Sequence, residues 1–181
     1  MLKTQIMKHL WRIVLLLLAP AFFQGCAEKN NWDLVWSEEF DYTGSPATES
    51  WGYETGYIRN NELQYYTDNL ENIRVEDGLC LISARNEGQD SITSASINTR
   101  SKKDFLYGRV EVRAQIPSAL GSWPAIWMLG TNRSELGWPA CGEIDIMEHV
   151  GYDPDFIHAN IHTKAYNHSI GTNKGNMIQQ Q

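Results

Sequence analysis

The sequence predicts an all-β domain, and three observations support this prediction. Short runs of β-branched and aromatic residues recur along the chain, and turn signals such as Asp77-Gly78 separate them. Residues 109–114 alternate charged side chains with valine and alanine, which is typical of a strand with one buried and one wet face. Because neither an internal repeat nor a long linker interrupts residues 32–181, we expect one β-sandwich domain there.

The turn signals place the expected strands in order. The first begins at Trp32 and closes on an acidic turn that contains Asp41. Residues 51–66 are dense in aromatic and amide side chains without a regular period, so we expect an ordered loop over the sheet. Later strands are expected at residues 73–75, 79–85, 92–99, 105–116 and 157–162, with a hairpin turn at Asp77-Gly78 between the first two.

Three carboxylates crowd into one strand-like segment that begins after Gly142. Side chains alternate along a strand, so Glu143 and Asp145 share a face, whereas Glu148 would point the other way. A β-bulge near Ile146-Met147 would absorb one residue and return Glu148 to the face of the other two acids. The sequence therefore predicts a strand with three acids on one face and apolar side chains on the other.

Like charges side by side on a sheet repel, so a purely structural strand gains nothing from three acids on one face. Crowded carboxylates differ in pKa, and one can then act as a nucleophile while another donates a proton. Retaining cleavage of a glycosidic bond uses two carboxyls roughly 5 Å apart in this way. The alternative is an acidic strand in solvent, or one that binds a cation with His149 and His162 as extra ligands. On the apolar face, Ile144 and one of Ile146 or Met147 are expected in the core.

Two flanking segments favour the catalytic interpretation. Residues 122–129 read Ser-Trp-Pro-Ala-Ile-Trp-Met-Leu, and residues 158–162 read His-Ala-Asn-Ile-His. With these flanks the acidic strand resembles the catalytic strand of glycoside hydrolase family 16, in its laminarinase-like branch, whose motif has a bulged form. The resemblance implies a β-sandwich of the jelly-roll, concanavalin-like type. It also implies that Glu143 is the nucleophile, that Asp145 assists it and that Glu148 is the acid/base.

The activity implied by the resemblance is retaining endo-hydrolysis of β-1,3-glucan (laminarin) or of mixed-linkage β-1,3-1,4-glucan, without a required cofactor. The alternative is a non-catalytic surface glycan-binding protein of the same fold. A net charge of −7 argues against nucleic acid and anionic membrane surfaces as partners and is compatible with a neutral polysaccharide. We expect a monomer.

The same resemblance indicates which side chains contact the substrate. Trp123 and Trp127 are four residues apart, so they would share a strand face and form a platform for sugar rings; two core tryptophans are the alternative. The other candidates are Asn61 and Glu62 in the aromatic loop, Arg85 at a strand end, and His162 near the catalytic strand. The alternative for Asn61 and Glu62 is an ordinary turn residue. The alternative for Arg85 is a solvated arginine. His162 is expected to hydrogen-bond the acid/base or a sugar hydroxyl.

Two further expectations concern calcium and the cysteines. Family members often bind structural calcium near the first strand, so Glu39 and Asp41 are candidate ligands. Calcium requires about six to eight oxygen ligands, however, and simply solvated acids are the alternative. Cys80 and Cys141 are expected to be two separate buried thiols, with a disulfide between them as the alternative.

Residues 1–25 are typical of an export signal. Lys3, Lys8 and Arg12 precede an apolar run at residues 13–23, which is too short for a transmembrane helix and fits the core of a signal peptide. We therefore exclude this segment from the fold.

The segment ends in Phe-Phe-Gln-Gly-Cys, which resembles a bacterial lipobox with Cys26 as the lipidated mature N-terminus. Gln24 departs from the small residue that is usual there, and ordinary cleavage and secretion is the alternative. We expect residues 26–31 to be a tether. The protein is expected in the cell envelope, at the outer membrane or cell surface, with membrane contact only through its lipid.

Residues 32–181 are expected to be a partial catalytic domain, incomplete at the C-terminus. Single-domain β-sandwiches commonly have roughly 200–250 residues, and residues 176–181 do not resemble a terminal strand. A sandwich that lacks strands leaves sheet edges unpaired and part of its core open.

Overall fold

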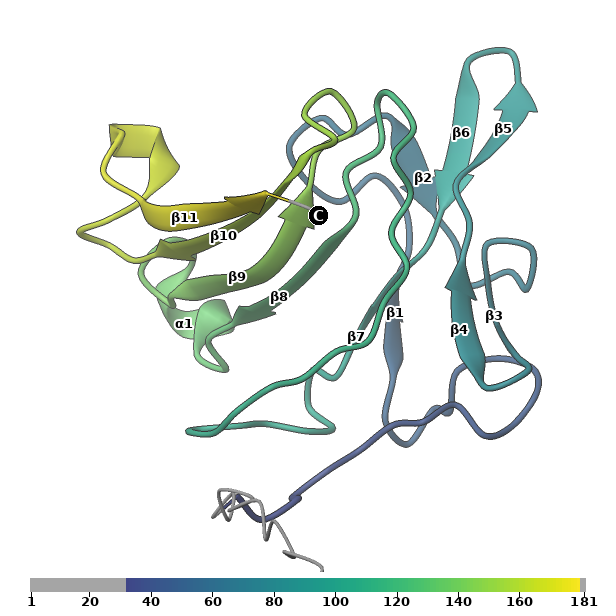
Figure 1. Ribbon diagram of the computed structural model, residues 1–181, viewed down its shortest axis with the longest axis horizontal. Coiled ribbons are helices and arrows are strands. Elements are labelled where there is room, and N and C mark those ends of the chain that lie inside the picture. The colour runs from purple at the N-terminus through teal and green to yellow at the C-terminus, as the bar shows by residue number, and fades with distance from the viewer. Residues whose placement is uncertain (1–31, 180–181) are drawn as a thin grey trace, which may run out of the picture. The chain divides into compact units, whose positions relative to one another are not determined.

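The computed structural model describes residues 32–179 (Figure 1). The expected signal segment, Cys26 and the tether at 26–31 lie outside the described residues. The chain divides into two units, Met1–Glu38 and Glu39–Gln181. Residues 32–38, the described part of the first unit, have no regular secondary structure. The strand expected from Trp32 is therefore not formed.

The regular secondary structure of the second unit is almost entirely β-strand. Its helical elements are a single turn, α1 (Arg133–Leu136), and a 3-10 turn, η1 (His168–Ile170). The strands are β1 (Gly52–Glu54), β2 (Gln64–Tyr66), β3 (Ile73–Glu76), β4 (Leu79–Ile82), β5 (Arg85–Gly88), β6 (Ser91–Ser94), β7 (Ser96–Asn98), β8 (Ala125–Leu129), β9 (Glu143–His149), β10 (Phe156–His162) and β11 (Lys174–Gln179). These elements confirm the predicted all-β class. Within residues 32–179, no helix has the length and apolar character needed to cross a bilayer.

The largest sheet has four strands in the order β11-β10-β9-β8, all antiparallel, with the acidic strand β9 in an interior position (Figure 1). The other sheets are β2-β6-β5, β1-β7 and the hairpin β3-β4. In that hairpin, Asp77 and Gly78 have φ angles of 53° and 74°. Positive φ at both positions is the geometry of a two-residue hairpin turn, so the hairpin prediction is confirmed.

Several expected strands differ from those observed. Residues 51–66, expected as one loop, contain β1 and β2 at their ends. The strand expected at 92–99 is divided into β6 and β7 at the buried Ala95, and each half pairs with a different sheet. Residues 105–116 form no strand. Their alternating pattern is that of a strand, but the pattern alone is not sufficient, because a strand also requires a hydrogen-bonded neighbouring strand.

Apolar side chains cover one face of the four-stranded sheet near the middle of β9. Ile126, Ile146, Met147 and Ile157 line a hollow of about 380 Å³, together with side chains of residues 110–116. Ile144 was expected in the core, but it is 49% exposed. Its cross-strand neighbour Ile161 is 48% exposed, because no described element covers this end of the face.

The most deeply buried apolar residues lie elsewhere, on the β3-β4 hairpin. Ile73 is 0% and Val75 is 1% exposed. Cys80, which pairs with Val75, and Cys141 are separate thiols, as expected, but both are half-buried rather than buried.

Candidate active site

The register of β9 shows how its three acids reach one face. Glu143 lies opposite Leu129, Asp145 opposite Trp127, and Glu148 opposite Ala125 of β8. Three steps along β9, from Asp145 to Glu148, therefore match two steps along β8.

The other neighbour of β9 shows the same shift. His162, Asn160 and His158 of β10 lie opposite Glu143, Asp145 and Glu148, in that order. One extra residue thus lies between Asp145 and Glu148 relative to both neighbours, which is a β-bulge at Ile146-Met147. Because alternate residues of β8 share a face, their three acidic partners share it too, as predicted.

Burial and mutual repulsion make this acidic cluster resist ionisation. Asp145 is 6% exposed. Burial and the charges of Glu148 and Glu143 raise the pKa of Asp145 to about 6, while His162 opposes the shift. Burial and the charge of Glu148 also raise the pKa of Glu143. The cluster therefore holds protons at a pH at which isolated carboxylic acids have lost them.

His162 contacts the acids at the Glu143 end of the cluster. Its Nε2 lies 3.2 Å from Oδ2 of Asp145 and 3.8 Å from Oε1 of Glu143. His162 therefore contacts Asp145 and Glu143 rather than the acid/base Glu148, because the register places it opposite Glu143. The alternative, a bond to a sugar hydroxyl, stays a prediction. The β10 side chain that bonds Glu148 is Asn160, whose Nδ2 donates to Oε2 of Glu148 over 2.9 Å.

Glu148 has a second donor from the adjacent tryptophan. Nε1 of Trp123 lies 3.1 Å from Oε1 of Glu148, and Trp123 is 60% exposed. A hollow of about 200 Å³ opens here. It is lined by Trp123, Glu148, Val150, Tyr152, Asp153, His158 and Asn160. Glu148 therefore lies at the wall of an open space, with both carboxylate oxygens held by N–H donors.

Trp138 is a partner of Glu143 that sequence reasoning missed. A hydrogen bond from the Trp138 side chain lowers the pKa of Glu143 and partly offsets its burial. The indole also packs on His168, with ring centroids 4.9 Å apart, and His168 in turn packs on His162 at 5.2 Å. His168 thus supports the side chains that contact the acids.

Both predicted platform tryptophans lie at the acidic face. Trp123 bonds Glu148, and Trp127 faces Asp145 across the strand pair. The guanidinium carbon of Arg59 lies 5.3 Å from the Trp127 ring centroid, so a cation packs against this indole. Stacking of sugar rings on the two tryptophans stays a prediction.

The loop between β1 and β2 contains two other predicted substrate contacts. Asn61 is exposed, and Glu62 is half-buried. Glu62 accepts hydrogen bonds from Tyr66 and Gln64 of β2. Their role in sugar binding stays a prediction.

Arg85 is not brought to the acids. It lies on β5 in a different sheet and pairs with Glu71 at 3.0 Å and with Glu87 at 3.2 Å. Its side chain is 45% exposed, which matches the solvated arginine weighed as the alternative. Its role in substrate binding stays a prediction without a supporting contact.

Within residues 32–179, Glu39 and Asp41 do not belong to a cluster of side chains close enough to hold a metal ion. Glu39 and Asp41 are both exposed. Among residues 32–179, the group of acidic and histidine side chains close enough to hold a metal is Glu143, Asp145 and His162, whose ligand atoms lie within 4.8 Å of one another. These three residues are the acidic cluster itself, and two exposed carboxylates supply few of the oxygens that calcium requires. Calcium binding near Glu39 and Asp41 stays a prediction.

Four residues that contact or influence the acids were missed from the sequence. They are Arg59, Arg133, Trp138 and Asn160. A signal existed for Asn160, because it alternates with His158 and His162 along one strand and so shares their face. The other three reach the site from loops or from the α1 turn, where no periodicity indicates direction.

Comparison with known proteins places this geometry in a family. Residues 47–180 match the family described as glycosyl hydrolases family 16. A beta-glucanase of Rhodothermus marinus is 52% identical over 157 residues, which cover 82% of this chain and 54% of that protein. Glucan endo-1,3-beta-glucosidase A1 of Niallia circulans is 38% identical over 149 residues, which cover 72% of this chain and 22% of that protein.

The solved structure of the laminarinase from Rhodothermus marinus matches with a TM-score of 0.77 at 50% identity, covering 82% of this chain and 62% of that one. The chain thus spans about half the length of the curated beta-glucanase. The likeness confirms the predicted jelly-roll β-sandwich class. The family match covers well over half of the residues, and the chain belongs to glycosyl hydrolases family 16.

Proposed function

We propose that this chain carries the catalytic centre of a retaining endo-β-glucanase that acts on β-1,3-glucan or mixed-linkage β-1,3-1,4-glucan. The observation that carries the proposal is the bulge in β9, which puts Glu143, Asp145 and Glu148 on one face. Retaining hydrolysis needs a nucleophile and a proton donor on the same substrate-binding face. The names of the relatives, a beta-glucanase and a glucan endo-1,3-beta-glucosidase, support β-glucan as the substrate class.

The proposed reaction has two displacements. In the first, Glu148 gives its proton to the leaving glycosidic oxygen while a carboxylate oxygen of Glu143 attacks the anomeric carbon, and a covalent glycosyl ester forms. In the second, Glu148 takes a proton from water, which attacks the same carbon and releases Glu143 as a carboxylate. The two reactions together consume one water and leave the anomeric configuration unchanged.

The surrounding residues suit these two roles. Trp123 and Asn160 hold both oxygens of Glu148 and fix the direction of proton transfer. The side chain of Trp138 donates to Glu143 and favours its nucleophilic carboxylate form. Asp145, whose pKa is raised to about 6, can share its proton with a neighbouring acid or with His162.

The location of the protein is part of the proposal. Export is supported by the basic and then apolar N-terminal sequence, and lipid anchoring by Cys26 in its lipobox-like setting. A monomer and a structural calcium ion near Glu39 and Asp41 are further proposals. Cell fractionation of the wild type and of Cys26→Ala tests the anchor, because loss of the acyl chains should move the protein from the membrane fraction to the soluble fraction. An unchanged membrane fraction would contradict lipid anchoring.

The activity is tested by incubating the full-length protein with laminarin, lichenan and agarose. We expect reducing ends from the first two glucans, and we expect Glu143→Gln and Glu148→Gln each to lose at least about a hundredfold in rate. Glu76→Gln, at an exposed acid of the β3-β4 hairpin, serves as the matched control and should keep wild-type activity.

Two results would contradict the proposed function. Unchanged hydrolysis in either catalytic-strand variant removes the mechanism. Binding of laminarin by the wild type without hydrolysis favours the non-catalytic glycan-binding protein that was the alternative from sequence.

A further inference from the structure

We propose that Arg59 is a positioning residue for the nucleophile Glu143: a clamped cation that the loop between β1 and β2 holds over Trp127, beside the acidic face. The inference rests on the proposed function, because it assigns Arg59 a part in the chemistry of that same site.

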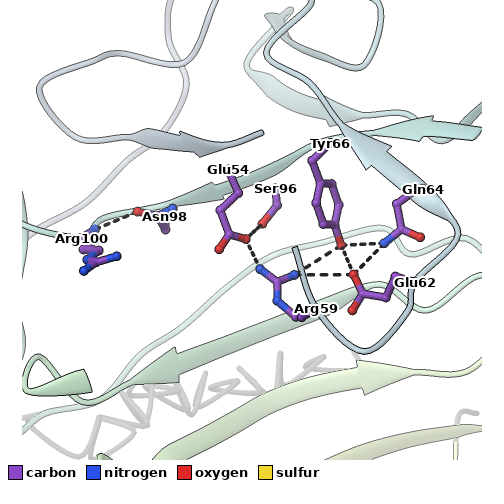
Figure 2. Close-up of polar contacts among 8 residues, drawn as sticks. All are labelled: Glu54, Arg59, Glu62, Gln64, Tyr66, Ser96, Asn98 and Arg100. Carbon is purple, nitrogen blue, oxygen red and sulfur yellow. Dashed lines mark hydrogen bonds and ion pairs between the residues drawn. The ribbon is translucent and has the colours of Figure 1, made fainter. Parts of the chain in front are cut away.

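Arg59 is fixed from two sides, as Figure 2 shows. On one side its guanidinium pairs with Oε2 of Glu54 on β1, and the hydroxyl of Ser96 on β7 donates to the same oxygen over 2.6 Å. On the other side Nη1 lies 3.4 Å from the hydroxyl of Tyr66 and 3.8 Å from Oε2 of Glu62. Arg59 thus connects β1 to β2 across the base of their loop.

The second set of partners is itself closed by hydrogen bonds. Tyr66 donates to Oε2 of Glu62 over 3.0 Å. Nε2 of Gln64 donates to the same oxygen over 2.9 Å and to the Tyr66 hydroxyl over 2.8 Å. A network in which each group restrains the next leaves Arg59 little freedom to move. A long arginine side chain would otherwise lose its direction to rotamer entropy.

The direction in which Arg59 is held matters for Glu143. The guanidinium carbon lies 5.3 Å from the ring centroid of Trp127, whose cross-strand partner is Asp145. Two residues further along β8, Leu129 is the partner of Glu143. The cation is therefore packed against the strand next to the acids, on the face where they lie. Its side chain is only 20% exposed, so water screens its charge less than that of a surface arginine.

Several charged groups face Glu143, and only some of them favour its carboxylate. Asp145 and Glu148 of β9 oppose ionisation of the cluster, and burial raises the pKa of Glu143 further. His162 of β10 lies 3.8 Å away and favours the carboxylate when it is protonated.

Beyond the Trp138 hydrogen bond, Arg133 of α1 and Arg59 lower the pKa of Glu143. Arg133 is exposed. Arg59 is half-buried and fixed, although the carboxylates of Glu54 and Glu62 share its charge. Of the two cations, Arg59 is therefore the one whose position and charge the fold controls.

A structural role for Arg59 and the proposed electrostatic role predict different pH profiles. If Arg59 only ties β1 to β2, its loss changes kcat/KM by the same factor at every pH. If it holds a positive charge for Glu143, its loss moves the acidic limb of the kcat/KM profile to higher pH, because the nucleophile then ionises less readily. A variant that keeps the positive charge should keep the acidic limb of the profile at its wild-type pH.

The test compares Arg59→Met, Arg59→Gln and Arg59→Lys in the full-length protein, with hydrolysis of laminarin measured from pH 4 to 8. We expect the two neutral variants to lose about tenfold in kcat/KM on the acidic limb and less than about threefold on the plateau. We expect Arg59→Lys to retain the wild-type limb. Arg74→Met, which removes an arginine of β3 that pairs with Glu76, is the control and should leave the profile unchanged.

The outcomes separate this inference from the function on which it rests. A wild-type protein without hydrolytic activity overturns the proposed function. An active wild type with neutral Arg59 variants that share its acidic limb overturns the role of Arg59 alone. Thermal unfolding of each variant identifies misfolding, and if Arg59→Met does not fold, Arg59→Gln, which keeps hydrogen-bond donors, decides the question.

Discussion

Replacing Asp145 by asparagine should change how the stability of the protein depends on pH. Burial and the charges of Glu148 and Glu143 raise the pKa of Asp145 from 3.8 to about 6. A carboxyl group whose pKa is raised on folding stabilises the folded state when protonated, at low pH. This contribution is complete below about pH 4 and is lost as the pH rises through about 6.

The size of the effect follows from the two pKa values. A difference of about two units corresponds to about 3 kcal/mol, at about 1.4 kcal/mol per unit. Since coupling to neighbouring acids and access of water reduce this figure, we expect about 1–3 kcal/mol. The wild type should lose this much free energy of unfolding between pH 4 and pH 7.5 through Asp145, and Asp145→Asn should not.

Guanidinium unfolding followed by tryptophan fluorescence at both pH values measures the effect. At each pH, the free energy of unfolding of the variant is subtracted from that of the wild type. The difference at pH 7.5 is then compared with the difference at pH 4, so that the contributions of other titrating groups cancel. Asp155→Asn, at an exposed turn residue, is the control and should give a difference near zero. Equal pH dependence in wild type and Asp145→Asn would refute the reasoning about burial and charge.

Three other substitutions test separate parts of the structure. Trp123→Phe removes the indole donor to Glu148 but keeps an aromatic ring, so kcat on laminarin should fall about tenfold with the melting temperature unchanged. A wild-type kcat would show that this hydrogen bond does not orient the acid. His162→Ala removes a group that opposes the pKa rise of Asp145, so the loss of stability with rising pH should start at the same pH, continue to a higher pH and become larger. Denaturation at several pH values measures this, and an unchanged profile would contradict the role of His162. Ile73→Ala leaves a cavity at the most buried apolar position of the β3-β4 hairpin and should lower the free energy of unfolding by about 2–4 kcal/mol. A loss below about 1 kcal/mol would mean that this hairpin contributes little to the core.

The acidic strand was predictable because its information is local. The alternation of apolar and acidic side chains indicates which face of the strand each side chain occupies. Relative to strict alternation, one extra residue lies between Asp145 and Glu148, so a bulge is required if all three acids share a face. The same alternation places Asn160 with His162, although the sequence alone did not reveal that Asn160 bonds Glu148. Which histidine or amide meets which acid depends on the register between β9 and β10, which sequence spacing does not contain.

Features that depend on distant parts of the chain were not predictable. Residues 105–116 have the pattern of a strand but form none, because strand formation also depends on a neighbouring strand that the local pattern does not specify. Arg59 gave no signal, because its partners come from β1, β2 and β7 and meet only in the folded chain. Arg85 was expected to contact the substrate, but the structure puts it on β5 with Glu71 and Glu87.

The claim on which the mechanism depends is that Glu143 attacks the sugar while Glu148, on the same face, handles the proton. A 2-deoxy-2-fluoro laminaribiosyl fluoride slows both displacements, and its good leaving group does not need the acid, so it should trap the covalent intermediate on the wild type and on Glu148→Gln. Mass spectrometry of the digested proteins should then find one sugar ester, on Glu143. An ester on Asp145 or Glu148, or no ester from an enzyme that hydrolyses laminarin, would contradict the mechanism.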